Sequence, residues 1–173
     1  MMNVDADPTR SGLQCEVQQT RPFTSLEQEA MLNIVRTAAV LEHLHAETFR
    51  RHGITATQYN VLRILRGAGA AGLCRNDVRD RLIAQVPDAT RLLDRMESMG
   101  LVTRSRDLGD RRQVNATITE RGLELLAALA EPVAEAHRRY LGHMTPEELQ
   151  ALIELSTRAR QGCPDVASER REP

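Results

Sequence analysis

The segment Thr90–Gln113, TRLLDRMESMGLVTRSRDLGDRRQ, joins a helical pattern to a hairpin pattern, and arginines recur in both halves. From residue 89 on, apolar side chains return at steps of three and four, the spacing of one face of a helix. These apolar residues are Ala89, Leu92, Leu93 and Met96. Arg91 and Arg95 fall on the opposite face. After Gly100 the pattern alternates with a period of two, which predicts strands.

A shorter helix is expected just before this one. The stretch 75–85, RNDVRDRLIAQ, predicts a brief helix that begins with Asn76 as its N-cap. Its expected inward residues are Val78, Leu82 and Ile83. The second helix then opens with Pro87 in its first turn, where a missing N–H costs nothing, and ends at Gly100.

The hairpin follows the second helix directly. LVTRSR (101–106) and VNATIT (114–119) predict two strands, and the glycine and aspartates of DLGDRRQ (107–113) favour a turn between them. The pair Leu73–Cys74 could form one further, short strand. Two short helices followed at once by a hairpin predict a winged helix-turn-helix. The expected fold class is mainly α with a small β-wing.

Longer helical patterns flank this lobe on both sides. Start signals stand at Thr55, Thr119 and Thr145, and Pro132 is expected to bend or split the helix that contains it. The terminal helices have apolar stripes that a small winged lobe could not cover, so a symmetric partner is expected. The predicted domains are an irregular N-terminal tail (1–24), a helical dimerisation region (25–52 and 120–162), a winged helix-turn-helix (54–119) and a C-terminal tail (163–173).

Composition narrows the class of protein. The chain has 173 residues, 41% hydrophobic and 27% charged, which are globular proportions. No run of residues is apolar enough for a membrane span, and no secretory signal is visible, so we expect a cytoplasmic protein. The net charge is −1, all 23 basic residues are arginine, and residues 75–112 hold nine arginines against seven acids. Guanidinium groups suit phosphates and guanine edges better than ammonium groups do.

Double-stranded DNA is the partner that these features favour. In a helix-turn-helix the second helix enters the major groove with its N-terminus first. The hairpin tip would then reach a neighbouring minor groove, whose negative potential attracts arginine. The expected DNA-binding residues are Arg75, Gln85, Pro87, Asp88, Thr90, Arg91, Arg95, Arg104, Asp110, Arg111 and Arg112.

Three segments together resemble the MarR family of bacterial transcription regulators: ITATQYNVLRIL, TRLLDRMESMGLVTR and DRRQVNATITERGLELL. The resemblance spans roughly residues 27–160. It implies a homodimer on a pseudo-palindromic operator, and repression that a small ligand or an oxidant relieves. It also implies a recognition helix over Pro87–Met99 and a wing pair of Asp110 and Arg112. Ala116 departs from the larger β-branched residue usual in the returning strand.

An effector site is expected where the helical region meets the winged lobe. Its candidate residues are His45, Phe49, Tyr59 and Arg63, and an aromatic acid is the ligand class considered. No cofactor motif, metal-ligand spacing or catalytic constellation is present, which argues against an enzyme. Two alternatives stay open: a thiol-based redox regulator using Cys15, Cys74 or Cys163, and a helical module that only dimerises without binding DNA.

Overall fold

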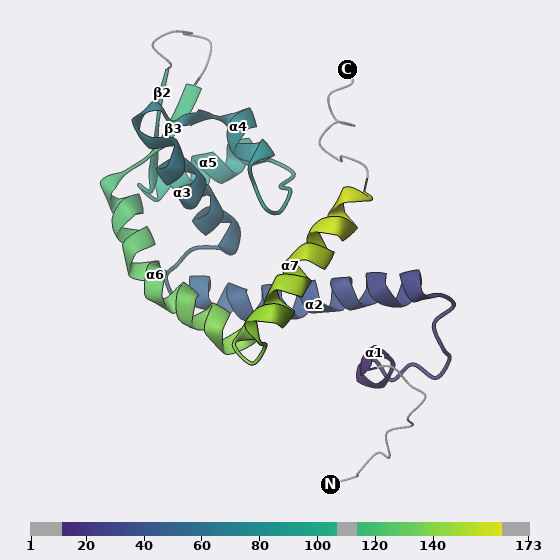
Figure 1. Cartoon of the computed structure of the whole chain (residues 1–173). Helices are drawn as coiled ribbons and strands as arrows, with labels where there is room; N and C mark the ends of the chain where they lie inside the picture. The colour runs from purple at the N-terminus through teal and green to yellow at the C-terminus, as the bar shows by residue number, and fades with distance from the viewer. Residues whose placement is uncertain (1–11, 107–113, 164–173) are drawn as a thin grey trace, which may run out of the picture. The chain divides into compact units, whose positions relative to one another are not determined.

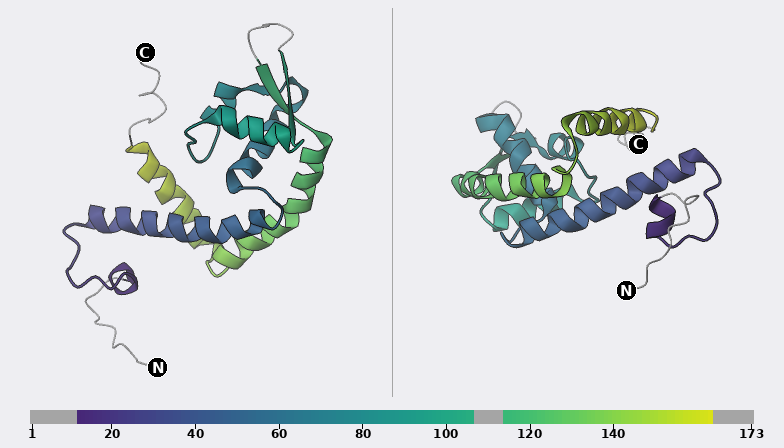
Figure 2. Two further views of the ribbon diagram at one scale, coloured as in Figure 1. Left: turned by 180° about the vertical axis from the view of Figure 1, so that it is seen from behind. Right: turned by 60° about the horizontal axis from the view of Figure 1, so that its bottom comes forward.

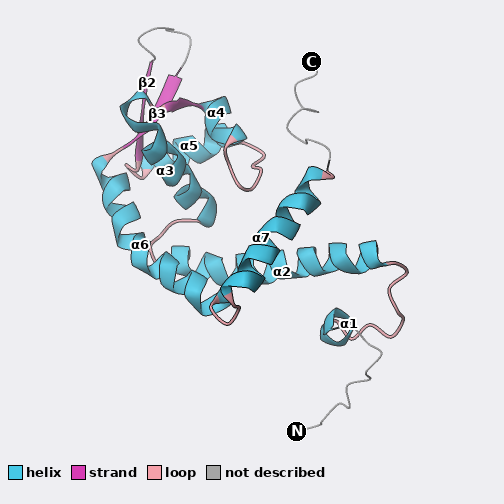
Figure 3. Ribbon diagram, viewed as in Figure 1, coloured by secondary structure: helices cyan, strands magenta, loops and turns pink. Residues whose placement is uncertain are grey.

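The computed structural model describes residues 12–106 and 114–163. The chain divides into two compact units, Met1–Leu44 and His45–Pro173, and the boundary falls within the long helix α2 (Leu26–Arg50). Figure 1 traces the chain through both units, and Figure 3 shows that helices make up most of it. No helix in the described ranges is long and apolar enough to cross a membrane.

The first unit contains a helix where the sequence predicts an irregular tail. Helix α1 (Gly12–Glu16) is only five residues long, with Leu13 buried. Glu16 pairs with Arg36 of α2 at 3.6 Å, and the side chain of Gln14 donates to the carbonyl of Arg21 at 3.0 Å. Such a helix is shorter than two turns, so it leaves no periodicity for a sequence pattern to reveal.

The second unit contains the predicted order of helices and strands. After the end of α2 its elements are α3 (Ala56–Ala68), the 3₁₀ turn η1 (Gly69–Ala71), β1 (Leu73–Cys74), α4 (Arg75–Asp80), α5 (Ala89–Ser98), β2 (Val102–Arg106), β3 (Val114–Ile118), α6 (Glu120–Leu141) and α7 (Pro146–Gln161). Mainly α structure with a small β-wing is therefore confirmed.

Three predicted helix starts are confirmed by their caps. Thr55 and Thr145 each form a capping box, in which the threonine side chain and the third helical residue satisfy each other's backbone N–H. Thr119 accepts a hydrogen bond from the N–H of Gly122 at the start of α6. Helix α6 continues through Pro132 without a break and curves along its length in Figure 1.

The small sheet has the order β1-β3-β2, with both pairings antiparallel. Ala116 in the central strand pairs with Leu73 on one side and with Arg104 on the other. Gly72 precedes β1 with φ of 65°, and a Cβ there would lie 2.5 Å from the carbonyl oxygen of Ala116. Only glycine fits this close approach, which closes β1 onto β3.

One hydrophobic core holds the winged lobe together and also reaches α6. Its largest fully buried side chains come from α3, α4, α5, β2 and α6. They are Val61, Leu62, Leu65, Val78, Met96, Val102 and Leu129. Helix α5 is therefore anchored to the same core as α3, α4 and α6.

Two helix boundaries differ from the prediction. Helix α4 ends at Asp80, its N-cap is Cys74 rather than Asn76, and Ile83 is 91% exposed rather than inward. Helix α5 starts at Ala89, which leaves Pro87 in the preceding turn. The chain can leave the helix after Asp80 because the side-chain oxygen of Asn60 on α3 accepts a hydrogen bond from the backbone N–H of Ile83 at 2.9 Å.

Candidate nucleic-acid interface

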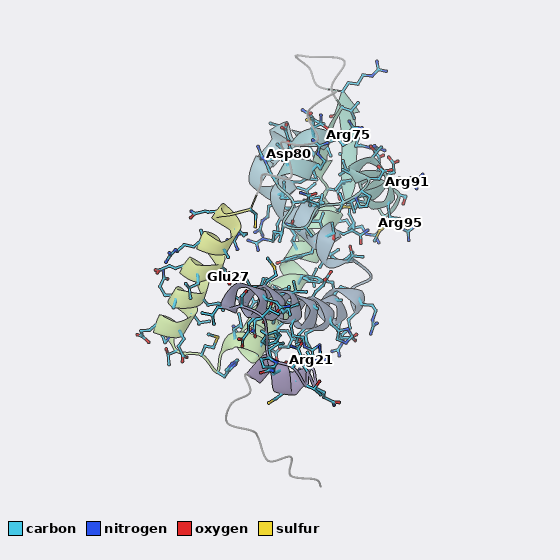
Figure 4. The ribbon with its side chains drawn as sticks, turned by 90° about the vertical axis from the view of Figure 1, so that its right-hand side faces the viewer. Arg21, Glu27, Arg75, Asp80, Arg91 and Arg95 are labelled. Atoms are coloured by element: carbon cyan, nitrogen blue, oxygen red, sulfur yellow. The ribbon has the colours of Figure 1, made fainter. Side chains whose placement is uncertain are left out.

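Helix α5 has one buried face and one cationic face, as the periodicity predicts. Leu93 and Met96 are 2% and 0% exposed, whereas the side chain of Arg91 is 88% exposed and Arg95 is exposed as well. Figure 2 (left) shows α5 on the side of the lobe that Figure 1 turns away from the viewer. Figure 4 shows Arg91 and Arg95 projecting along that one edge. Neither arginine is turned inward.

The N-terminus of α5 is fixed by Asp88. Its carboxylate accepts hydrogen bonds from the backbone N–H groups of Thr90 at 2.9 Å and Arg91 at 3.0 Å. It also lies 3.2 Å from Nε of Arg91. A carboxylate at this position satisfies unpaired helix donors and suits the helix dipole. Asp88 thus has a structural partner in the backbone, a role that its expected place among base contacts did not include.

Arg75 brings the start of α4 to the start of α5. Its guanidinium donates to the Oγ1 atom of Thr90 at 3.3 Å and to the Oδ1 atom of Asn76 at 3.4 Å. Arg75 is exposed and Thr90 is half-buried. Arg75, Thr90 and Arg91 are therefore gathered at one end of α5.

The turn between α4 and α5 lies beside this cluster. Gln85 and Pro87 are both exposed. The hydrogen bond from Ile83 to Asn60 ties the turn to α3. Asn60 is a positioning residue that the sequence analysis missed, because its partner lies 23 residues away and no local pattern links the two.

Arg104 points toward α5. Its Nε and Nη2 atoms donate to Oε2 of Glu97 at 2.9 and 2.7 Å, and Nη2 also lies 2.5 Å from Oδ1 of Asp94. The side chain of Arg104 is 27% exposed. The hydrogen bond to Glu97 is the main cause that raises the pKa of Arg104 above its ordinary value. Arg104 thus has carboxylate partners that its predicted place among DNA contacts did not include.

The predicted wing tip, Asp110, Arg111 and Arg112, lies outside the described residues. The base of the wing is described: Ser105 pairs with Asn115 and Arg106 with Val114. The side chain of Asn115 also donates to the carbonyl of Ala71 at 3.3 Å, which ties the returning strand to η1.

Three of the four predicted effector residues lie in an aromatic cluster. The ring centroids of Phe49 and Tyr59 are 4.8 Å apart, and those of His45 and Phe49 are 6.0 Å apart. His137 and Tyr140 of α6 extend the cluster to the other side of His45, at 5.1 and 6.1 Å. Arg63 is exposed on α3. Burial is the main cause that lowers the pKa of His45, and the charge of His137 lowers it further.

An open hollow of about 350 Å³ lies beside this cluster. The end of α2 and the second half of α6 line it, with Arg51, Arg139 and Tyr140 among the lining residues. Only Tyr140 belongs to both the cluster and the hollow. Arg51 and Arg139 are candidate ligand contacts that the sequence analysis did not single out.

The three cysteines are free. Cys15 and Cys163 are exposed, and the half-buried Cys74 donates to Oδ2 of Asp77 at 3.2 Å. Within the described ranges no group of three or more potential ligand residues could hold a metal ion.

A capped helix with an arginine face, beside a three-stranded wing, defines a winged helix-turn-helix regulator. The sequence model of the MarR family matches residues 54–114. A MarR transcription factor from Planctomyces limnophilus is 42% identical, with 79% of this chain and 98% of that chain covered and a TM-score of 0.61. AbsC, a MarR family regulator from Streptomyces coelicolor, is 27% identical, with coverage of 82% and 97% and a TM-score of 0.69.

A curated relative agrees with these structures. The homoprotocatechuate degradative operon repressor of Escherichia coli is 31% identical over 106 residues, which are 61% of this chain and 70% of the relative. The chain therefore belongs to the MarR family, whose members are DNA-binding transcription regulators.

Proposed function

We propose that this regulator is a homodimeric repressor that binds a pseudo-palindromic operator in the cytoplasm and is released by a small aromatic acid. The observation that supports it most is helix α5, which anchors Leu93 and Met96 in the core while Arg91 stays exposed. A core-anchored helix with an exposed cationic face meets the requirement for entry into a major groove. The Escherichia coli relative is itself named a repressor.

In this proposal the N-terminal end of α5, where Arg75, Thr90 and Arg91 are gathered, enters the groove first. Arg91 and Gln85 reach base edges, and Arg75 and Arg95 meet phosphates on either side. A bidentate arginine–guanine contact discriminates against a wrong base by about 1–3 kcal/mol. Thr90, Pro87 and the tip residues Asp110, Arg111 and Arg112 complete the proposed surface, with the tip in the minor groove.

Exposed apolar residues support the homodimer. Ile153 and Leu155 of α7 are 59% and 61% exposed, and Met31 and Val35 of α2 are 57% and 55% exposed. Large apolar side chains exposed together on a helix usually mark a surface that binds a partner. A second copy of the chain, related by twofold symmetry, covers the same residues on both subunits.

The aromatic acid is proposed from the hollow beside α6. Its ring would rest against Tyr140, and its carboxylate would meet Arg51 or Arg139. Binding there changes the packing between the α2 end and α6, next to the cluster that includes Tyr59 of the winged lobe. A ligand shifts DNA affinity only if it binds the two states of the protein differently.

Selection of genomic fragments with purified protein tests the proposal. We expect one enriched inverted repeat, with affinity that falls steeply as salt rises because bound arginines release counterions. Arg91→Ala should lower affinity and relax base preference, whereas Arg95→Ala should weaken binding evenly across sequences. A helical module that only dimerises would show no enrichment and no salt dependence.

The effector arm uses benzoate as probe and cyclohexanecarboxylate as its non-aromatic control. We expect benzoate to release the operator from wild-type protein and to release it less from Arg139→Gln. Release by a mild peroxide, lost in a cysteine-free variant, would instead favour the redox regulator.

A further inference from the structure

The wing and the recognition helix α5 are joined at two points. At the first, Gly100 has φ of 70° and the N–H of Leu101 returns to the carbonyl of Met96 at 3.0 Å, so the chain turns sharply from α5 into β2. At the second, the Arg104 guanidinium in the middle of β2 reaches Asp94 and Glu97 on α5. Val102 at the inner end of β2 is buried in the same core as α5, and β3 is paired with β1, so the Arg104 contacts add a link two residues farther out along the hairpin.

We propose that Arg104 is a positioning residue that locks the wing against the recognition helix, rather than a residue that contacts DNA. The inference rests on the proposed DNA-binding function and assigns the mechanical link within that site. We call the triad of Arg104, Asp94 and Glu97 the wing clamp.

The charge of the wing clamp argues against a phosphate contact. One guanidinium faces two carboxylates, so the three side chains sum to −1. An approaching phosphate would meet a net repulsion there, unlike at Arg95, which is exposed on the same helix. Arg104 is also the least exposed member of the clamp, at 27% against 51% for Asp94 and 39% for Glu97.

The geometry requires a guanidinium. Asp94 and Glu97 are three residues apart and lie almost one turn apart on α5. The Nε and Nη2 atoms of Arg104 reach both carboxylates at 2.5–2.9 Å. On the neighbouring strand, the residue paired with Arg104 is Ala116. A lysine ammonium is a point donor that cannot hold two acceptors in this fixed, planar arrangement.

Neutralising the carboxylates separates positioning from phosphate contact, because the two roles predict opposite signs. If Arg104 contacts a phosphate, Glu97→Gln and Asp94→Asn free its charge and remove repulsion, so operator affinity rises. If Arg104 positions the wing, the loss of the clamp outweighs the removal of one negative charge and both variants lower affinity, by about fivefold for a partly exposed charged hydrogen bond. Glu42→Gln, which removes an exposed charge on α2, is the matched control and should change little.

Salt dependence gives a second readout. Each phosphate contact that is lost reduces the slope of log affinity against log salt by about 0.9. Loosening the wing would also withdraw its tip arginines from the DNA, so we expect Arg104→Met and Glu97→Gln to reduce this slope by the same amount. Arg104→Lys should not restore affinity. A slope reduced by Arg104→Met but unchanged in Glu97→Gln would assign Arg104 a phosphate contact and overturn the inference.

Footprinting locates the loss. Hydroxyl-radical protection at the wing's minor groove should fade in Glu97→Gln, while protection of guanine N7 by α5 in the major groove remains. Circular dichroism confirms that each variant is folded, and Glu97→Gln decides the question if Arg104→Met does not fold. If wild-type protein selects no operator, the proposed function fails. If it does so but the acid variants bind more tightly, only the wing clamp fails.

Discussion

Replacing Asp88 by alanine removes the acceptor of two backbone N–H groups, those of Thr90 and Arg91, at 2.9 and 3.0 Å. Loss of an N-cap costs about 1 kcal/mol, within a range of about 0.5–2 kcal/mol. The adjacent ion pair adds little, because the side chain of Arg91 is 88% exposed and such pairs are worth less than about 1 kcal/mol. Asp88→Ala should therefore cost about 1 kcal/mol of unfolding free energy.

Asp88→Asn is the informative companion variant. An asparagine keeps a capping oxygen but has no charge, so it should retain most of the stability and lose only the dipole contribution of about 0.3–1 kcal/mol. On DNA it should bind as tightly as wild type or more tightly, because one negative charge near the phosphates is gone. Asp88→Ala should bind more weakly, because the end of α5 must then be ordered on binding.

Urea unfolding with a common m-value measures the first effect, and thermal unfolding should shift by about 2–4 °C per kcal/mol for a chain of this size. Operator titration measures the second effect. Unchanged stability in Asp88→Ala together with lost base preference in Asp88→Asn would refute the capping role. It would restore Asp88 as a base contact, which is the role that the sequence alone predicts.

Three further predictions concern the fold. Gly122→Ala should destabilise the protein by about 1–3 kcal/mol in thermal or urea unfolding, because its Cβ would lie 2.5 Å from the carbonyl oxygen of Leu101; a gain, as alanine usually gives within a helix, would contradict this packing. Met96→Ala should cost about 2–5 kcal/mol by the same measurement, since Met96 is fully buried on the core face of α5. Partial burial, and then the charge of the neighbouring His137, lower the pKa of the half-buried His45, so the unfolded chain binds the proton more readily. The stability that neutral His45 contributes is therefore present above about pH 6.5 and lost as the pH falls through the lower folded pKa; melting temperatures from pH 7.5 to 5.5 should decline less in His45→Phe than in wild type.

The helix starts that the sequence predicts best are those with one unambiguous signal. Thr55 and Thr145 each precede a glutamine or glutamate at the third position, and both capping boxes are present. The start of α5 has two competing signals, because Pro87 suits a first turn and Asp88 suits an N-cap. The cap prevails, since its carboxylate satisfies two backbone donors while proline satisfies none.

The face of α5 could be predicted because it depends only on local periodicity. The partners of Arg104 could not, because Asp94 and Glu97 meet it only after a strand has folded back beside the helix. The exposure of Ile83 escaped prediction for a related reason. The apolar pattern places Ile83 on the inner face of a helix, but its backbone N–H bonds to Asn60 on another helix and its side chain is exposed.

Acidic residues between the arginines divide those arginines into two kinds. At Arg104 two carboxylates outweigh the guanidinium, so its hydrogen bonds can fix geometry without attracting phosphates. At Arg95 the exposed guanidinium stays available for DNA. A regulator with every arginine free would bind any duplex tightly, because phosphate attraction is independent of sequence. If Arg104 fixes the wing as we propose, it contributes rigidity instead of phosphate attraction. This lowers the sequence-independent background and favours binding to one operator over the many competing sites of a genome.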